Sequence, residues 1–409
     1  MKKHLLRLSI FLILSSFLFD MLNLGMKSPS DRWEYFYNLP KNSVDVLFLG
    51  NSHNFTSFQP EIIDQIIPVN SYVLGVNAEN VIISYYELRE ALKYQHPKVV
   101  VLETYALDLD DSVKKGYIYE FLDSGPWSLN KMAVAARYLT PETAYAVFPA
   151  LRTRIDWNKI STIFNQLDDQ LSSKHQVITD PMNGATPKDN VIKEDDYLAS
   201  KEKVISSNKQ PQADIDIYLR KMYLLCKDYG IKLVLVKVPI VSITSSQVDY
   251  YAPYNISGFV NDYQVDTLIF DKNQFNHIDF ADSSHPSSFG SIKISIQLAR
   301  ELAQIMNLPV DQDALNYFDT FVFTDYKLTE DNGQYKLELF PSDPTVPLKY
   351  HWSIKDINTK EIIYDDDWSN RRTFIFSLPN DGSFHVNIKV MNPEGDYQIS
   401  AYFSVGDEN

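Results

Sequence analysis

Three residues of this sequence have side chains that can together form an activated nucleophile. Ser52 follows the apolar run 46–49 and Gly50, and His285 stands three residues after Asp282 in the segment DSSHPS. A serine hydroxyl is a poor nucleophile until a base removes its proton, and a carboxylate that orients a histidine completes such a base. The sequence therefore offers Ser52 as nucleophile, His285 as base and Asp282 as the orienting carboxylate.

Few histidines of the chain suit the role of base. Of the eight, one lies in the N-terminal apolar segment, two in polar segments and two in the C-terminal region, which leaves His53, His277 and His285. We assign no role to His53 and expect His277 at the surface or in a substrate wall. No two histidines have a ligand-like spacing with acidic neighbours outside the triad hypothesis, so we expect no metal and no cofactor.

Each motif also has a simpler interpretation. Taken alone, Ser52 is an ordinary turn serine, and Asp282 with His285 is a helix-capping arrangement. Their joint occurrence, in this order and at the ends of expected elements, favours catalysis.

The elements that must position these residues follow an alternating pattern. Nearly continuous apolar runs predict strands, and amphipathic periods between them predict helices; the strands are expected at 44–49, 71–74, 98–102, 232–238 and 266–270, and the helices at 79–94, 213–229 and 287–306. This alternation indicates an α/β fold, a parallel five-stranded sheet with helices on both faces. Ser52 and His285 would then meet at the carboxyl edge of the sheet.

The length of 409 residues implies two domains. We expect an α/β domain at 44–310 with an insertion at about 109–211, which is either a lid or substrate wall or a solvated excursion. From about 317 to 409, alternating apolar and polar residues between turn signals predict an immunoglobulin-like β-sandwich, an accessory domain that contacts carbohydrate or protein.

The N-terminus has the pattern of an export signal. Lys2, Lys3 and Arg7 precede the apolar run 8–19, and no clear cleavage site follows it. We favour an uncleaved signal-anchor at 1–26 with a connector at 27–43, which would tether the chain to the cell membrane with its bulk extracytoplasmic. A cleaved signal followed by secretion is the alternative.

Charge and cysteine content restrict the partners. The chain has 38 basic and 53 acidic residues, a formal net charge of −15, which argues against nucleic-acid binding and leaves a neutral or glycan substrate easier to accommodate. The single cysteine, Cys226, is expected to be a small buried hydrophobe, and no disulfide within the chain is possible.

These motifs resemble those of the SGNH (GDSL-like) hydrolase superfamily over about residues 44–306. The segment GNS at 50–52 matches the first block of that family and DSSH at 282–285 its last, and LGVN at 74–77 is similar to the second. The resemblance implies a three-layer α/β fold and an oxyanion hole that uses Gly75. The third block departs from the family, because VLETY at 101–105 lacks its asparagine. Asn77 would supply the missing amide donor.

The absence of this asparagine from the third block resembles the pattern in membrane-anchored members of that family, such as alginate O-acetyltransferase-like and teichoic-acid D-alanylation proteins. The resemblance implies a membrane-tethered serine esterase or O-acyltransferase, with O-acetyl transfer to a polysaccharide slightly preferred and a membrane-bound protein as a possible acyl donor. Tyr105, Asp108 and Asp110 follow the third expected strand and would also lie at the active edge, where they either contact a sugar or are simply loop residues. The alternative is a catalytically degenerate protein of the same fold that binds polysaccharide or an envelope assembly.

Overall fold

A five-stranded parallel sheet forms the centre of the chain. The computed structural model describes residues 2–107, 115–152, 164–165, 167, 182–202, 204–205, 213–241, 243–244, 257–379 and 382–406. The strand order is β2-β1-β3-β6-β8, with β1 at Val46–Leu49, β2 at Ser71–Val73, β3 at Val99–Glu103, β6 at Lys232–Lys237 and β8 at Asp266–Ile269. All four neighbouring pairs are parallel. Each strand lies within or one residue from a predicted run, which confirms the predicted α/β sheet.

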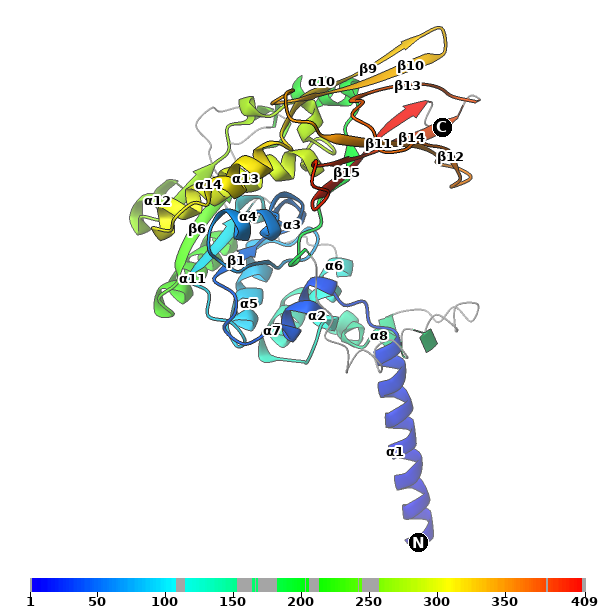
Figure 1. Ribbon diagram of the computed structural model, residues 1–409. Helices are drawn as coiled ribbons and strands as arrows, with labels where there is room; N and C mark the ends of the chain where they lie inside the picture. Colours follow the sequence, from blue (N-terminus) through cyan, green and yellow to red (C-terminus); the bar gives the residue numbers. More distant parts are fainter. Residues whose placement is uncertain are drawn as a thin grey trace.

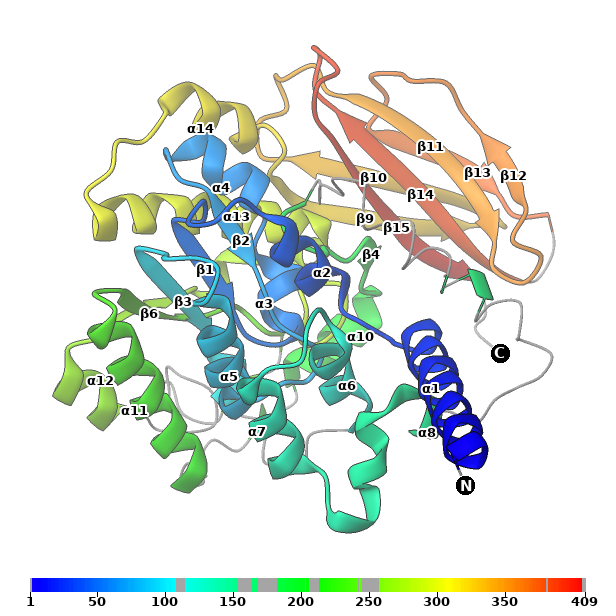
Figure 2. The ribbon, with the colours of Figure 1, turned by 90° about the horizontal axis from the view of Figure 1, so that it is seen from below.

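Alternate residues of the central strands pack on opposite faces of the sheet. Val46 and Phe48 of β1 belong to the apolar cluster that contains α4 (Pro60–Ile66) and α13 (Ser288–Met306). Leu47 and Leu49 belong to the cluster on the other face, formed with α5 (Val81–Ala91) and α11 (Ala213–Asp228). Figure 2 shows α4 and α13 on one side of the sheet and α5 and α11 on the other. Because both faces are covered, the strands are almost continuously apolar.

One helix lies where the sequence pattern predicted only a connector. The predicted connector contains α2 (Asp31–Asn38), in which Trp33 and Phe36 are fully buried. The Trp33 Nε1–H donates to Glu87 Oε1 at 2.8 Å, so this helix is bound to the α/β core. The α/β part also contains the short α-helices α3 (Ser52–Ser57), α6 (Lys115–Asp123), α7 (Leu129–Tyr138), α8 (Pro149–Arg152), α10 (Glu194–Glu202) and α12 (Ser257–Tyr263). Its short 3-10 helices are η1 (Thr104–Leu107), η2 (Pro141–Val147), η5 (Lys272–Gln274) and η6 (His277–Asp279). The two-residue strands β5 (Val204–Ile205) and β7 (Ile243–Thr244) pair with each other.

The N-terminal helix α1 (Lys2–Gly25) projects from the body of the molecule, as Figure 1 shows. Its base contacts the body where the rings of Phe19 and Phe148 lie 5.6 Å apart. Among the side chains of α1 that the structure describes, seven large apolar ones are exposed, namely Ile10, Phe11, Leu12, Ile13, Leu14, Phe17 and Leu18. Within the described part of the chain, none of the helices has both the length and the apolar content that crossing a membrane requires.

Two further sheets, mostly antiparallel, follow the α/β part. One has the order β13-β10-β9 and the other β12-β11-β14-β15-β4. Their strands are β4 (Asn190–Val191), β9 (Phe323–Asp331), β10 (Gln334–Pro341), β11 (Lys349–Asp356), β12 (Ile362–Asp365), β13 (Thr373–Ser377), β14 (Ser383–Met391) and β15 (Gln398–Gly406). The rings of Trp352 on β11 and Phe374 on β13 stack at 5.3 Å, which joins the two sheets. The short β4 comes from the predicted insertion and pairs in parallel with β15.

The C-terminal sheets share an apolar core with the α/β part. Helix α14 (Gln312–Asp319) connects the two, and Phe321 packs against Tyr397 with ring centroids 4.9 Å apart. Phe289 at the start of α13 packs against Phe323 at 5.0 Å. One cluster of buried side chains therefore extends from the parallel sheet into both antiparallel sheets. The region expected to be an accessory domain is packed directly on the α/β part.

Candidate active site

Ser52 is presented by a tight turn between β1 and α3. Gly50 has φ +140°, and a Cβ there would lie 3.1 Å from the Cβ atoms of both Asn54 and Glu103, so a glycine lets the chain turn close to β3. Asn51 caps α3, since its side chain accepts a hydrogen bond from the N–H of His53. Ser52 is the first helical residue and lies beyond the carboxyl end of β1. The chain continues from β1 to β2 on one side and later to β3 on the other, and this change of direction is where α/β sheets usually bind ligands.

His285 and Asp282 lie in a turn that precedes α13. The turn is closed by a hydrogen bond from the Ala281 N–H to the His285 carbonyl at 2.9 Å. Asp282 Oδ1 accepts from the backbone N–H groups of Ser284 and His285, both at 2.9 Å. These local bonds hold Oδ1 of the carboxylate beside the imidazole, and His285 Nδ1 lies 2.9 and 3.0 Å from the two carboxylate oxygens.

The three predicted residues form a continuous hydrogen-bonded chain. His285 Nε2 lies 2.8 Å from Ser52 Oγ. With a carboxylate at Nδ1, the imidazole carries its proton there and presents the Nε2 lone pair to the serine hydroxyl. Burial raises the pKa of Asp282, but hydrogen bonds from His285 and Lys188 outweigh it and hold the pKa well below its usual range. Asp282 is therefore ionised at neutral pH, as the orienting carboxylate of a base must be.

Two backbone N–H groups are available as donors near Ser52. The first N–H groups of a helix lack an acceptor within the helix, which leaves the N–H of Ser52 available. Gly75 follows β2 with φ +131°, and a Cβ there would lie 1.9 Å from the Gly50 carbonyl oxygen. Among the described residues, no group accepts a hydrogen bond from the Gly75 N–H. The neighbouring Val76 N–H donates to buried Glu79 at 2.7 Å, which fixes the loop.

The side chain of Asn77, the second predicted oxyanion donor, is directed to α6. Its amide nitrogen lies 3.2 and 3.4 Å from the two carboxylate oxygens of Glu120. No hydrogen bond joins Asn77 to Ser52 or His285 among the described contacts. The structure therefore brings Gly75 against the Ser52 turn, whereas the Asn77 amide would have to leave Glu120 to act as a donor there.

Tyr105 and His53 form one aromatic stack beside the triad. Their rings lie 3.9 Å apart at an interplanar angle of 12°, and the His53 ring lies 4.7 Å from that of His285. Burial, and to a smaller extent the neighbouring His285, lower the pKa of His53 well below its usual value. His53, to which we assigned no role from the sequence, is thus a neutral ring of the site wall. Asp108 and Asp110 lie outside the described residues.

Lys188 is a site residue that the sequence did not reveal. Its Nζ lies 2.7 Å from Asp282 Oδ2, on the carboxylate oxygen that accepts no backbone hydrogen bond among the described contacts. Lys188 belongs to the predicted insertion, 94 positions before Asp282, and no local pattern relates the two residues.

His277 is buried and lies outside the triad. Its Nδ1 pairs with Asp325 at 2.9 Å, and its ring packs on Tyr326 at 4.2 Å. We expected His277 at the surface or in a substrate wall, but its side chain is buried and joins η6 to β9. In the described ranges, no group of three or more His, Cys, Asp or Glu side chains has an arrangement that could hold a metal ion.

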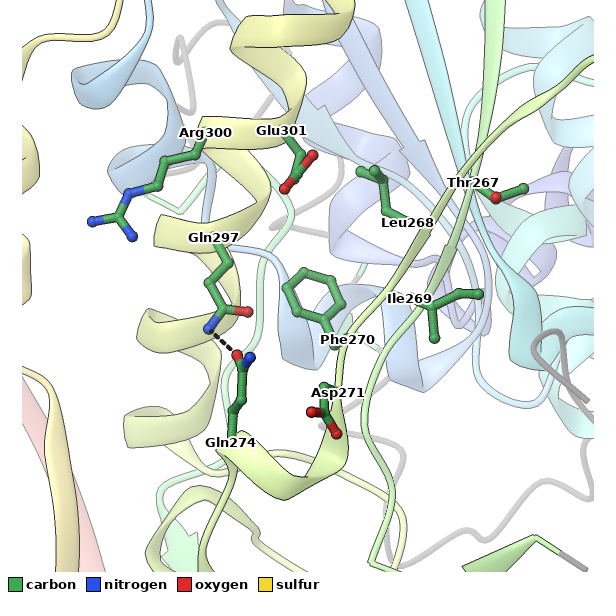
Figure 3. A pocket seen from close by; sticks show the side chains of 9 residues that line it. All are labelled: Thr267, Leu268, Ile269, Phe270, Asp271, Gln274, Gln297, Arg300 and Glu301. Carbon is green, nitrogen blue, oxygen red and sulfur yellow. Dashed lines mark hydrogen bonds between the residues drawn. The ribbon is translucent and has the colours of Figure 1, made fainter. Parts of the chain in front are cut away.

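A hollow of about 470 Å³ lies away from the triad, between β8, η5 and α13. Figure 3 shows its lining, in which Gln297 of α13 donates to Gln274 of η5 at 3.2 Å. The strand β8 is at the edge of the parallel sheet. None of the predicted site residues lines this hollow.

Comparisons with protein-family models and with curated proteins find no significant match. A family 76 glycoside hydrolase from a bovine Bacteroides thetaiotaomicron strain aligns at 10% identity and a TM-score of 0.16, over 21% of this chain and only 20% of the hydrolase chain. An engineered protein aligns over 93% of this chain and 98% of its own at 7% identity and a TM-score of 0.17. At such TM-scores these alignments carry no argument about fold or function.

Proposed function

We propose that this chain is a serine esterase or O-acyltransferase of the SGNH type that forms an acyl-Ser52 intermediate. The observation that carries the proposal is the hydrogen-bonded chain from Ser52 through His285 to Asp282, with distances of 2.8 and 2.9 Å. The close approach of Gly75 to the Ser52 turn supports the same assignment. Both were expected from motifs far apart in the sequence.

The reaction would proceed in two balanced steps. In the first, Ser52 Oγ attacks the carbonyl carbon of an acyl ester while His285 Nε2 takes the hydroxyl proton, and the leaving alcohol receives that proton as the ester bond breaks. The N–H groups of Ser52 and Gly75 would stabilise the negative oxygen of the tetrahedral intermediate. In the second step His285 Nε2 takes a proton from water or a glycan hydroxyl, whose oxygen attacks the acyl carbonyl carbon. His285 then returns the proton to Ser52 Oγ as the bond between the acyl group and Ser52 breaks, which releases a carboxylic acid or the acylated glycan.

Transfer to a cell-surface or secreted polysaccharide is the preferred outcome, with acetyl as the preferred group. The half-buried Tyr105 beside the triad suits stacking on a sugar ring. The exposed apolar side chains of α1 support a membrane tether. The basic residues Lys2, Lys3 and Arg7 before the apolar run favour an extracytoplasmic position for the bulk of the chain. That tether is tested by fractionation of the full-length chain, since a released species shortened near residue 25 would instead indicate a cleaved signal.

A second candidate is a polysaccharide-binding protein of the same fold without catalysis. The hydrogen bonds that hold the Asn77 amide on Glu120 favour it, because they leave the oxyanion with backbone donors alone. Binding would then tolerate loss of the Ser52 hydroxyl.

An acyl-enzyme trap separates the two candidates. Residues 27–409 are incubated with p-nitrophenyl acetate, quenched in acid and measured by intact mass, with Ser52→Ala and Thr56→Ser as target and matched control. One acetyl group on the parent and on Thr56→Ser, lost from Ser52→Ala, is the expected result. Adding an oligosaccharide acceptor then measures the partition between transfer and hydrolysis. No acetylation of the folded parent supports the binding protein.

A further inference from the structure

One short segment, residues 188–191, lies along the turn that carries Asp282 and His285. The Lys188 carbonyl accepts hydrogen bonds from the Ser288 N–H at 2.7 Å and from the Ser288 hydroxyl at 3.1 Å. Asn190 donates its side-chain amide to the Ala281 carbonyl at 2.5 Å. The segment therefore holds the turn both before Asp282 and after His285.

The same segment is fixed on its other side by the C-terminal sheet. Asn190 and Val191 pair with Tyr402 and Phe403 of β15, and the Tyr402 N–H donates to the Asp189 carbonyl at 2.7 Å. The position of the Lys188 backbone is thus set by a strand more than 200 positions later in the chain.

The ammonium group of Lys188 completes the contacts of the Asp282 carboxylate. Oδ1 accepts from the N–H groups of Ser284 and His285, and the imidazole Nδ1 lies within 3.0 Å of both oxygens. Oδ2 is held by Lys188 Nζ at 2.7 Å. The backbone bonds and the Ser284 hydroxyl, at 3.1 Å, all act on Oδ1, and the Asp282 side chain is 40% exposed. Without Lys188 the carboxylate can therefore turn about Oδ1 and carry Oδ2 toward solvent. Rotation would release the imidazole from the geometry that directs Nε2 at Ser52.

We propose that Lys188 is a positioning residue that holds the Asp282 carboxylate in the orientation in which it aligns His285 with Ser52. Lys188 acts through Asp282 and donates to neither Ser52 nor His285 among the described contacts. The catalytic consequence rests on the proposed function, whereas the alignment of the imidazole does not.

The chain offers a matched control for the loss of a lysine–aspartate pair. Lys232 and Asp266 also lie 2.7 Å apart, with side-chain exposures of 47% and 40% against 33% and 40% for Lys188 and Asp282. They lie at the start of β6 and β8, at the amino edge of the sheet, whereas the triad is at the carboxyl edge. Lys232→Met therefore removes an equivalent ion pair without touching the site.

The first readout is the rate at which a fluorophosphonate labels the protein. Lys188→Met should slow labelling about 10- to 100-fold, the size of effect that small misplacements of reacting groups produce. Lys188→Arg should restore most of the rate and Lys232→Met should leave it unchanged. In an Asp282→Asn background Lys188→Met should have almost no further effect, because a residue that acts through Asp282 has nothing left to position. A slowing that persists in that background, with a lower melting temperature, would mean that Lys188 is merely structural.

The second readout does not depend on activity. The low-field proton resonance of His285 Nδ1–H, assigned by its loss in His285→Ala and Asp282→Asn, should be lost or broadened in Lys188→Met and retained in Lys188→Arg and Lys232→Met. If the parent is not labelled but this resonance responds as expected, the proposed function fails and the positioning role holds. An unchanged resonance in Lys188→Met overturns the positioning role, whatever the labelling shows.

Discussion

His285 Nε2 lies 2.8 Å from Ser52 Oγ, although 233 positions of sequence separate the two residues. Neither side chain reaches this position by chance packing of flexible loops. Ser52 is set by Gly50 and the cap of α3, and His285 by a turn whose carboxylate accepts two backbone N–H groups. Both are delivered to one edge of a buried sheet, which is the arrangement that a base and its nucleophile require.

Gly75 should be intolerant of a side chain. A Cβ would lie 1.9 Å from the Gly50 carbonyl oxygen, so Gly75→Ala must displace the Ser52 turn as well as strain its own backbone at φ +131°. Such backbone strain alone costs about 1–3 kcal/mol. We expect Gly75→Ala to lower the free energy of unfolding by at least about 2 kcal/mol and to slow labelling of Ser52 more than 10-fold.

Gly333 provides the matched control for that substitution. It also has a positive φ, +75°, but a Cβ there meets no atom within 4 Å. Gly333→Ala should therefore lower the free energy of unfolding, measured in urea, through backbone strain alone. The rate at which Ser52 is labelled should not change. Equal labelling rates of the Gly75→Ala and parent proteins would refute the close packing of Gly75 against the Ser52 turn.

Asp64 should make stability depend on pH. Burial raises the pKa of Asp64 from 3.8 to about 7, against the opposing hydrogen bonds from Ser71. Between these values the folded state binds more protons than the unfolded state, so this group lowers the free energy of unfolding as pH rises. Asp64→Asn cannot ionise and keeps an oxygen for Ser71. We therefore expect the free energy of unfolding of Asp64→Asn, minus that of the parent, to rise from about pH 4 to about pH 7 and to stay constant at higher pH. Urea unfolding at each pH measures this difference. A pH-independent difference would contradict the raised pKa.

The α/β part and the C-terminal sheets should unfold together. Phe321 is fully buried in the apolar cluster that both parts share, and it contacts Tyr397. Phe321→Ala should cost about 3–5 kcal/mol and shift one cooperative transition, seen alike by near-UV and far-UV circular dichroism. Ile375→Ala, at a side chain that is 56% exposed, is the control and should cost no more than about 1 kcal/mol. Two separate transitions would show that residues 317–409 form an independent domain.

The parts of the structure that the sequence predicted are those that depend on local pattern. Buried parallel strands such as β3 and β6 must be apolar on both faces, so they appear as continuous runs. The order of Ser52, Asp282 and His285 at the ends of these elements was enough to predict that they meet.

Contacts between distant segments explain what the sequence did not predict. The two-residue strand β4 has no pattern of its own and exists because β15 pairs with it. The sequence around Lys188 does not distinguish it from other lysines, and the pairing of β4 with β15 places it beside Asp282. Likewise, the polar sequence around His277 gives no sign that β9 covers it, and the partner of Asn77 is a glutamate of a helix 43 positions away.

The most direct test is covalent labelling of Ser52. Residues 27–409 are incubated with a fluorophosphonate, and the intact mass is measured beside Ser52→Ala, His285→Ala and the control His277→Ala. We expect one adduct on the parent and on His277→Ala. The labelling rate of Ser52→Ala and of His285→Ala should be at least about 10³-fold lower, because the nucleophile and its base act as a unit. No adduct on a folded parent, or labelling that survives Ser52→Ala, would contradict the assignment of Ser52 as an activated nucleophile.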